Sequence, residues 1–447
     1  MFRFRSSRPR RARTALAVLA TLFVLAPAPL PAQQVSRELI QRGRRMLEQL
    51  RKDLKENYYD TNFQGIDLDA KFVQADSAIQ AAPTPNHIMA AIADYLAQFN
   101  DSHTRFVPPS RVASVDYGFR TMFVGDTCFI TSVRKGSDAE KEGLKPGDAL
   151  LVLDRFKVDR RSWKVLSYVY YQLSPRERIK VVVKPVNAAP REVALEAKVT
   201  SGAKVVDLTD IEVRRRMIVE YEDAAREPTH FYRSFGDSVL VWRMPQFIYA
   251  DEQAIDEMLK RARGHRSLIL DLRNNPGGSV DTELYVAGSF IPGGDTVTVF
   301  TMKTRKGDEV MRARNKGREI FMGRMVVLVN SNSASASEIT ARIMQLQDRA
   351  TVVGDRTAGA VVTSRMFYRE VGGVERVMNY AASISVADVI MPVGNRLENV
   401  GVTPDIVVLP TGEDIAAKRD PQMAKALEIV GMKMTPAEAS LAVRKDD

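Results

Sequence analysis

The residues that build covalent cross-links and metal centres are scarce in this 447-residue sequence. A single cysteine, Cys128, excludes a disulfide within the chain and a cysteine cluster for zinc. The four histidines, His87, His103, His230 and His265, are too few for a histidine-rich metal centre. We therefore expect a protein that needs no metal ion and no organic cofactor.

Long apolar runs are also scarce. The most pronounced one extends from Ala15 to Ala26 and is too short to cross a bilayer comfortably. Six arginines and no acidic residue precede this run, and small residues and prolines follow it. This three-part design is typical of an export signal, so residues 1–32 are predicted to be a leader that is cut near Ala32. We expect the mature chain to be periplasmic or extracellular and to have no membrane span.

Strong positive charge is mostly confined to that leader. The whole chain has a formal net charge of +10, and the loss of six arginines with residues 1–32 leaves +4. A weakly basic mature chain gives little reason to expect a nucleic-acid partner.

Changes in periodicity divide the rest of the chain into four segments. Apolar residues recur every three or four positions across residues 33–112, which predicts a helical subdomain. Short alternating strands across 113–202 predict a mostly β domain, and strands that alternate with helices across 203–412 predict an α/β core. A closing helix and a polar tail are expected over 413–447. The predicted fold class is a multidomain α/β protein.

Several common catalytic motifs are absent, including G-x-S-x-G, H-E-x-x-H and the phosphate-binding G-x-x-x-x-G-K-[ST]. Serine chemistry stays open at "VNSNSASASEIT", where a predicted strand leads into a predicted helix. The free N–H groups of a first helical turn can hold an oxyanion, which favours Ser335 as a nucleophile. However, Ser335 and Glu338 also have the S-x-x-E spacing of a capping box. The local pattern therefore supports both interpretations.

A second polar loop, "DLRNNPGG", follows a predicted buried strand. Its paired glycines, Gly277 and Gly278, would let backbone N–H groups approach a ligand without obstruction by side chains. The loop can supply one half of an oxyanion hole, although a plain turn explains the glycines equally well.

In this order, "DLRNNPGG", "VVLVNSNSASASEI", "RATVVGDRTAG" and "LENVGVTPDIVV" resemble the tail-specific or C-terminal processing serine proteases. The segment "VRKGSDAEKEGLKPGDALLVLDRFKV" resembles the PDZ domain that these enzymes carry ahead of a crotonase/ClpP-like α/β core. Together the similarity covers nearly the whole mature chain. It implies a serine-type endopeptidase in which Ser335 is the nucleophile and the N–H groups of Gly278 and Ala336 hold the oxyanion.

The sequence departs from the bacterial tail-specific enzymes at the catalytic base. Their lysine in T-x-G-K-G corresponds to Ala360, and no lysine occurs between residues 316 and 418. The loop "NDSHTRF" resembles instead the tricorn-type core proteases, which use serine, histidine, a second serine and a glutamate. That resemblance implies His103 as the base, Ser102 as a support and Glu398 as the acid that orients the imidazole.

Two alternatives stay open. Asp405 and Glu370 are weaker candidates for the acid. A serine hydroxyl without a base is a poor nucleophile at neutral pH, so a chain in which no base reaches Ser335 would be an inactive PDZ-containing scaffold that binds peptides.

The PDZ-like segment indicates how a polypeptide substrate would be bound. In this branch of the family the carboxylate-binding loop lies early in the domain, at "DYGFRTMF" here. The N–H groups of Gly118 and Phe119 would hold the C-terminus of a protein or peptide, with Tyr117 and Met122 in the same site. Alternatively, the domain only gates or braces the core. A homo-oligomer is compatible with either arrangement.

Overall fold

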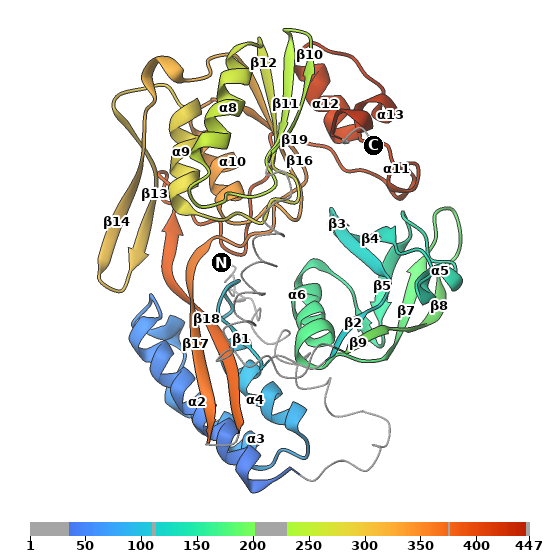
Figure 1. The fold of residues 1–447 in the computed structure, drawn as a ribbon, viewed down its shortest axis with the longest axis vertical. Helices are drawn as coiled ribbons and strands as arrows, with labels where there is room; N and C mark the ends of the chain where they lie inside the picture. The colour runs from blue at the N-terminus through green and yellow to red at the C-terminus, as the bar shows by residue number, and fades with distance from the viewer. Residues whose placement is uncertain (1–34, 110–112, 202–229, 374–375, 444–447) are drawn as a thin grey trace, which may run out of the picture.

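The structure is a computed structural model of the chain and describes residues 35–109, 113–201, 230–373 and 376–443 (Figure 1). The predicted leader and its cleavage site lie outside the described residues, so export stays a prediction.

Three helices form the amino-terminal unit. They are α2 (Arg37–Asn57), α3 (Leu68–Gln80) and α4 (Pro85–Ala97), with the 3-10 turn η1 (Phe63–Gly65) between the first two. Helix α2 begins after Ser36, whose side chain accepts a hydrogen bond from Leu39 N, and it buries Leu50 and Leu54 completely. Part of the range predicted for the helical subdomain folds elsewhere, because β1 (Arg105–Val107) pairs with β18 (Arg376–Ile390), a strand from the range predicted for the core. The "SHT" loop therefore lies where the helical unit meets the core.

The next unit is a small, mostly β module built on a sheet in the order β3-β4-β5-β7-β8, with β6 paired to β5. Its elements are β2 (Ala113–Asp116), β3 (Phe119–Val124), β4 (Thr127–Val133), α5 (Asp138–Lys141), β5 (Ala149–Leu153), β6 (Phe156–Lys157), α6 (Arg160–Tyr168), η2 (Val169–Leu173), β7 (Arg178–Lys184), β8 (Arg191–Glu196) and β9 (Lys198–Ser201). Strand β3 lies at the edge of this sheet. The assignment of the module as a PDZ domain stays a prediction.

A second six-stranded sheet is the centre of the core, in the order β10-β11-β12-β15-β16-β19. Its strands are β10 (Phe231–Phe235), β11 (Val239–Arg243), β12 (Ser267–Asp271), β15 (Arg324–Val329), β16 (Thr351–Gly354) and β19 (Ile406–Val407). All neighbours are parallel except β10 and β11. Strand β12 is buried along its whole length because helices cover both faces of the sheet.

The helices on the two faces come from different parts of the chain (Figure 1). One face packs on α8 (Glu252–Arg263), α9 (Val280–Phe290) and α10 (Ala336–Leu346). The other packs on α12 (Pro421–Ile429), α13 (Pro436–Ala439) and η4 (Ser440–Val443), which follow α11 (Gly412–Ala416). The closing segment predicted over 413–447 therefore completes the core instead of extending from it.

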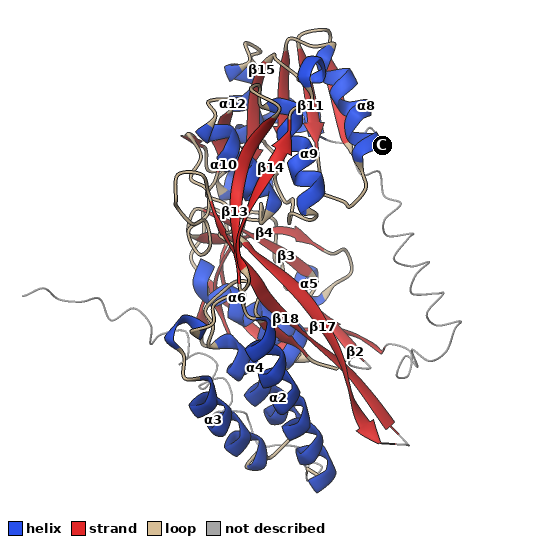
Figure 2. Cartoon of the chain, turned by 90° about the vertical axis from the view of Figure 1, so that its left-hand side faces the viewer, coloured by secondary structure: helices blue, strands red, loops and turns tan. Residues whose placement is uncertain are grey.

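Two long hairpins form a further sheet that joins the core to the helical unit. They are β13 (Thr296–Thr304) with β14 (Gly307–Arg314), and β17 (Val362–Gly373) with β18 (Arg376–Ile390). The β17–β18 hairpin extends beside α2 and α4 (Figure 2). An ion pair between Arg369 and Asp53 at 2.7 Å ties this hairpin to α2.

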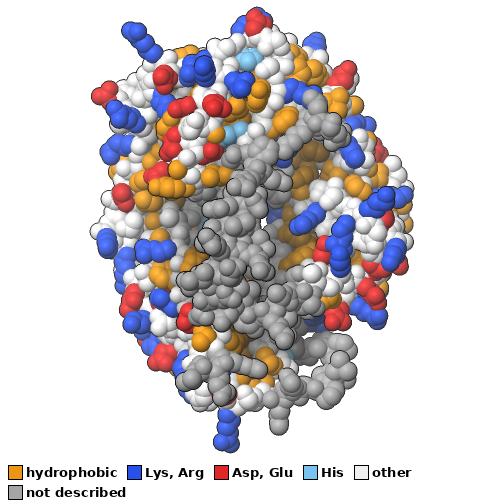
Figure 3. Space-filling view, in the orientation of Figure 1, with side chains coloured by type: hydrophobic (Ala, Val, Ile, Leu, Met, Phe, Trp, Pro, Cys, Tyr) orange, Lys and Arg blue, Asp and Glu red, His pale blue; other side chains and the backbone are white. Residues whose placement is uncertain are grey.

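The described elements combine helices and strands as the sequence predicts. In the described part of the chain, none of the helices combines the length and the apolar character that a bilayer crossing requires. On the face drawn in Figure 3, lysine and arginine side chains are interspersed with aspartate and glutamate instead of forming one basic patch.

Candidate active site

Ser335 lies in the turn between β15 and α10, immediately before the first helical residue. Its backbone dihedrals are φ 56° and ψ −121°. An ordinary N-cap residue has an extended backbone, whereas a positive φ is sparsely populated by residues other than glycine. Strained backbones of this kind cluster at functional sites, so the conformation favours a role for Ser335 beyond capping the helix.

The neighbouring Glu338 does more than complete a capping box. It is fully buried, and its carboxylate accepts hydrogen bonds from the N–H groups of Ser335 (3.1 Å), Ala360 (2.9 Å) and Gly359 (2.8 Å) and from the Thr357 hydroxyl. Burial raises the pKa of Glu338, and these four donors oppose that rise. The carboxylate thus fixes the Ser335 turn to the loop 357–360. In the sequence, the S-x-x-E spacing was the pattern that involved Glu338, and it predicted a helix cap without the contacts to the loop 357–360.

The glycine loop packs directly against Ser335. A Cβ atom on Gly277 would lie 2.6 Å from Ser335 Cβ and 3.0 Å from Ala336 N, so a larger residue does not fit there. Phe247 holds the loop, because its N–H donates to Gly277 O at 3.0 Å and its carbonyl accepts from Ser279 N at 2.7 Å.

The N–H groups of Gly278 and Ala336, the predicted oxyanion donors, border the same turn. Neither has a hydrogen-bond acceptor among the described residues. Two unpaired backbone donors at the turn that carries Ser335 can hold a developing negative charge.

The predicted base, support and acid are brought together from 296 residues apart. The Ser102 hydroxyl donates to Glu398 Oε2 at 2.9 Å and contacts His103 Nδ1 at 2.6 Å, and Ser102 N donates to Glu398 Oε1 at 2.7 Å. A hydroxyl has one proton, so a Ser102 oxygen that donates to Glu398 must accept a hydrogen bond from the Nδ1–H group of His103. Nε2 then carries the free lone pair that a general base needs. The carboxylate of Glu398 therefore contacts the imidazole through the Ser102 hydroxyl, the residue predicted as a support.

One peptide unit joins this relay to the backbone of Ser335. The carbonyl of Ala360 accepts from Ser335 N at 3.0 Å, and the following N–H, of Val361, donates to Glu398 Oε2 at 2.7 Å. Ala360 is the position at which the resemblance placed the missing lysine. Here its backbone, instead of a side chain, connects the two halves of the site.

Burial dominates the electrostatics of the relay. It lowers the pKa of His103, Asp101 opposes this change, and Arg105 and Lys164 add to it. The neutral imidazole, which accepts a proton, is therefore favoured at neutral pH. Burial raises the pKa of Glu398, and hydrogen bonds from Val361 and Ser102 oppose that effect.

The weaker candidates for the acid have other partners. Asp405 accepts from Val352 N at 2.8 Å and from Gln345 at 2.9 Å, beside β16. Glu370 lines a groove between α2 and β17. In the residues that the structure describes, no group of three or more histidine, cysteine or acidic side chains is arranged to hold a metal ion.

The residues predicted to bind a peptide are engaged within the chain in this structure. Tyr117 is buried, and its hydroxyl donates to Arg176 O at 3.0 Å. Gly118 N donates to the Asp116 carboxylate at 2.7 Å, and Phe119 is buried at the start of the edge strand β3. Met122 Sδ accepts from Asn330 at 3.3 Å, so that side chain faces the core.

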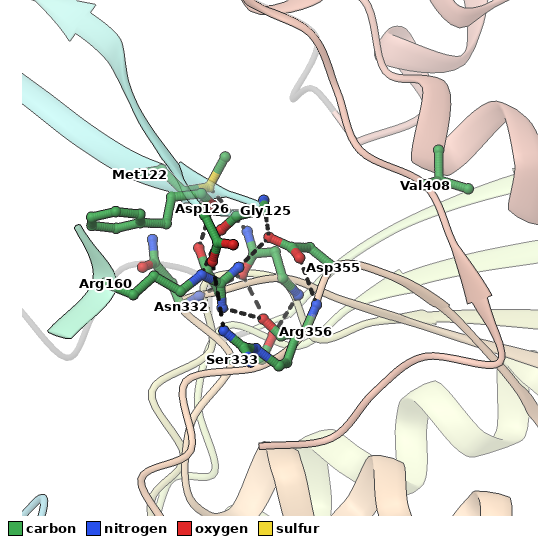
Figure 4. A network of polar contacts seen from close by, with 12 residues as sticks. Met122, Gly125, Asp126, Arg160, Asn332, Ser333, Asp355, Arg356 and Val408 are labelled. Atoms are coloured by element: carbon green, nitrogen blue, oxygen red, sulfur yellow. Dashed lines mark hydrogen bonds and ion pairs between the residues drawn. The ribbon is translucent and has the colours of Figure 1, made fainter. Parts of the chain in front are cut away.

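The β module contacts both loops that carry the candidate site (Figure 4). Ser331, in the loop that leads to Ser335, donates to Phe123 O at 2.5 Å. Asp355, at the start of the loop that leads to Val361, accepts from Gly125 N at 2.9 Å and from Arg160 at 2.6 Å. These contacts join residues some 200 positions apart, and no local pattern in the sequence indicated them.

Comparison with known proteins gives the relationship that this geometry suggests. Residues 238–408 match the model of peptidase family S41. The chain is 27% identical over 303 residues to the carboxyl-terminal-processing protease of Synechocystis sp., in an alignment that covers 66% of this chain and 63% of that protein. It is 27% identical over 418 residues to the chloroplastic C-terminal processing peptidase of Tetradesmus obliquus, covering 86% of this chain and 81% of the relative.

A solved structure of mature CPAF complexed with lactacystin has a similar fold. The TM-score is 0.62, and the match covers 85% of this chain and 96% of that one at 15% sequence identity. At this identity the likeness concerns the fold alone.

Proposed function

Because residues 238–408 belong to peptidase family S41, we propose that the chain is a serine endopeptidase in which Ser335 attacks the peptide bond and His103 takes its proton. The matches to C-terminal processing proteases support a serine peptidase. The assignment of His103 as the base rests on one observation, the hydrogen-bonded series from Glu398 through Ser102 to His103.

In the proposed mechanism, His103 Nε2 accepts the proton of the Ser335 hydroxyl as the oxygen attacks the substrate carbonyl. The N–H groups of Gly278 and Ala336 stabilise the oxyanion that forms. The imidazolium then gives the proton to the leaving amine, and water releases the acyl group from Ser335 in a second step with the same base. Ser102 and Glu398 keep Nδ1 protonated throughout, so that only Nε2 exchanges a proton.

The natural substrates are proposed to be polypeptides that are recognised near their C-termini, outside the cytoplasm. The family resemblance and the position of β3 at the edge of its sheet support this proposal, because an extended peptide can add to an edge strand. The predicted leader supports the location. The Gly118 N–H group would have to leave Asp116 to bind a terminal carboxylate, so peptide binding there requires a rearrangement of that turn.

An inactive peptide-binding scaffold is the second candidate. The relay argues against the scaffold, because a serine that only caps a helix does not require a glutamate, a second serine and a histidine in one hydrogen-bonded series.

Labelling by a fluorophosphonate probe separates the two candidates. We expect the parent protein to be labelled at Ser335, and Ser335→Ala and His103→Ala to lose labelling. His265→Ala is the matched control, because His265 lies in the turn after α8 and, among the described residues, its ring bonds only to Arg261 O. Absence of labelling in all four proteins supports the scaffold. Unchanged labelling of His103→Ala removes the proposed base.

A further inference from the structure

A second carboxylate holds the loop of His103 and is not part of the relay to Glu398. Asp101 Oδ1 accepts from His103 N (3.0 Å), Thr104 N (2.6 Å) and the Ser385 hydroxyl (2.9 Å). Its other oxygen, Oδ2, accepts from the Tyr58 hydroxyl at 3.0 Å. The donors come from three parts of the fold: the loop itself, the end of α2 and strand β18. One carboxylate thus sets the backbone of the turn that presents the imidazole.

The surroundings keep this carboxylate in place. Ser385 is fully buried, and its N–H donates to the Thr104 hydroxyl at 3.2 Å, so both the backbone and the side chain of this β18 residue bind the same turn. Tyr58 is also fully buried, and burial raises the pKa of its hydroxyl, which stays a neutral donor. Four hydrogen-bond donors, from the loop itself, from Tyr58 and from Ser385, therefore hold this carboxylate in place.

The charged groups around His103 have opposite effects on the protonated imidazole. Arg105, at the start of β1, and Lys164, from α6, disfavour a positive imidazole. Asp101 favours it. Glu398 reaches the ring only through the Ser102 hydroxyl, which makes it suited to fix the tautomer.

We propose that Asp101 is a positioning residue for the proposed base: it fixes the 101–104 turn and supplies the negative charge that stabilises the imidazolium of His103 during turnover. The inference rests on the proposed function. The two carboxylates then have different tasks. Glu398 fixes the tautomer of the ring, and Asp101 supplies the negative charge that stabilises its protonated form. In the sequence, "NDSHT" marked this aspartate as a loop residue only.

The test measures the rate of fluorophosphonate labelling against pH for the full chain. Asp101→Asn keeps an acceptor for the turn and removes the charge. Asp101 favours the charged ring, so loss of its negative charge lowers the pKa of His103. The acid limb of the profile should therefore move to lower pH. The plateau should fall about tenfold, because the imidazolium is less stabilised.

Ser385→Ala separates the geometric task from the electrostatic one. This variant loosens the turn without changing a charge, so the plateau should fall while the acid limb stays where it is in the parent. Asp308→Asn is the matched charge control, because Asp308 is exposed and lines the cavity beside Asp101 without a bond to the His103 loop. Its profile should coincide with that of the parent. A thermal melt of each variant establishes that it is folded.

An unmoved acid limb in Asp101→Asn overturns the inference. So does an equal shift in Asp308→Asn, or a larger shift in Glu398→Gln, which would assign the charge to Glu398. These outcomes differ from a failure of the proposed function, in which the parent is not labelled or His103→Ala is labelled as fast as the parent.

Discussion

Replacement of Gly277 by alanine tests whether the glycine loop must touch the nucleophile turn. Gly277 has φ +94°, and its added Cβ would lie 2.6 Å from Ser335 Cβ and 2.8 Å from Ala334 O. The left-handed backbone alone costs an alanine about 1–2 kcal/mol. The close contacts involve the backbone of the Ser335 turn, which must shift, and a shift of about 1 Å in a catalytic group can cost about 100-fold in rate.

The matched control is Gly431→Ala. Gly431 has a similar φ of +88° in the turn after α12, but nothing lies within 4 Å of its added Cβ. Gly431→Ala should lose about 1–2 kcal/mol of the free energy of unfolding in a thermal or urea melt, and Gly277→Ala should lose more, because its close contacts add to the same backbone strain. Only Gly277→Ala should also lose fluorophosphonate labelling, by about 100-fold.

Two results would refute the reasoning. If folded Gly277→Ala is labelled at the parent rate, the glycine loop and the serine turn do not depend on each other in solution. If Gly431→Ala loses labelling to the same extent, the loss reflects backbone strain anywhere in the chain and not contact at the site.

Three further predictions follow from the contacts of the site. Ser102→Ala removes the hydroxyl that fixes the His103 tautomer and should slow labelling about 100-fold at an unchanged melting temperature; a parent-like rate would contradict the relay. Glu338→Gln places an NH₂ group where a carboxylate oxygen accepted, so at least one backbone N–H group loses its acceptor and the free energy of unfolding should fall by about 1–3 kcal/mol; an unchanged urea midpoint would remove Glu338 from its central place. Because burial lowers the pKa of His103 and the neutral ring is the active form, the midpoint of the acid limb of labelling against pH should lie below about 6.5, and a midpoint above that value would contradict the sign.

The sequence predicted those features of the site that depend on neighbouring residues in the chain. Ser335 and the glycine loop could be predicted because a strand, a turn and a helix start are visible in consecutive residues, and the family resemblance then pointed to Ser102, His103 and Glu398. The structure brings these last three into one hydrogen-bonded series. The alternation of strands and helices in the core could be predicted for the same reason.

What could not be predicted depends on residues that only the fold brings together. The relay passes through the Ser102 hydroxyl because the loop approaches Glu398 by its backbone N–H group, a geometry that no spacing encodes. Asp101 looked like a loop residue because its partners Tyr58 and Ser385 lie 43 and 284 positions away. The pairing of β1 with β18, which places the loop, is likewise a contact between distant segments.

Chemical rescue of the base tests the central claim most directly. The measurement is the rate of Ser335 labelling by a fluorophosphonate in His103→Ala as free imidazole is added, beside His265→Ala and Ser335→Ala. We predict that His103→Ala is labelled at least about 100-fold more slowly than the parent and that imidazole raises its rate, while the other two variants do not respond. Labelling of His103→Ala at the parent rate without imidazole would contradict the account, because the proton of Ser335 would then have another acceptor.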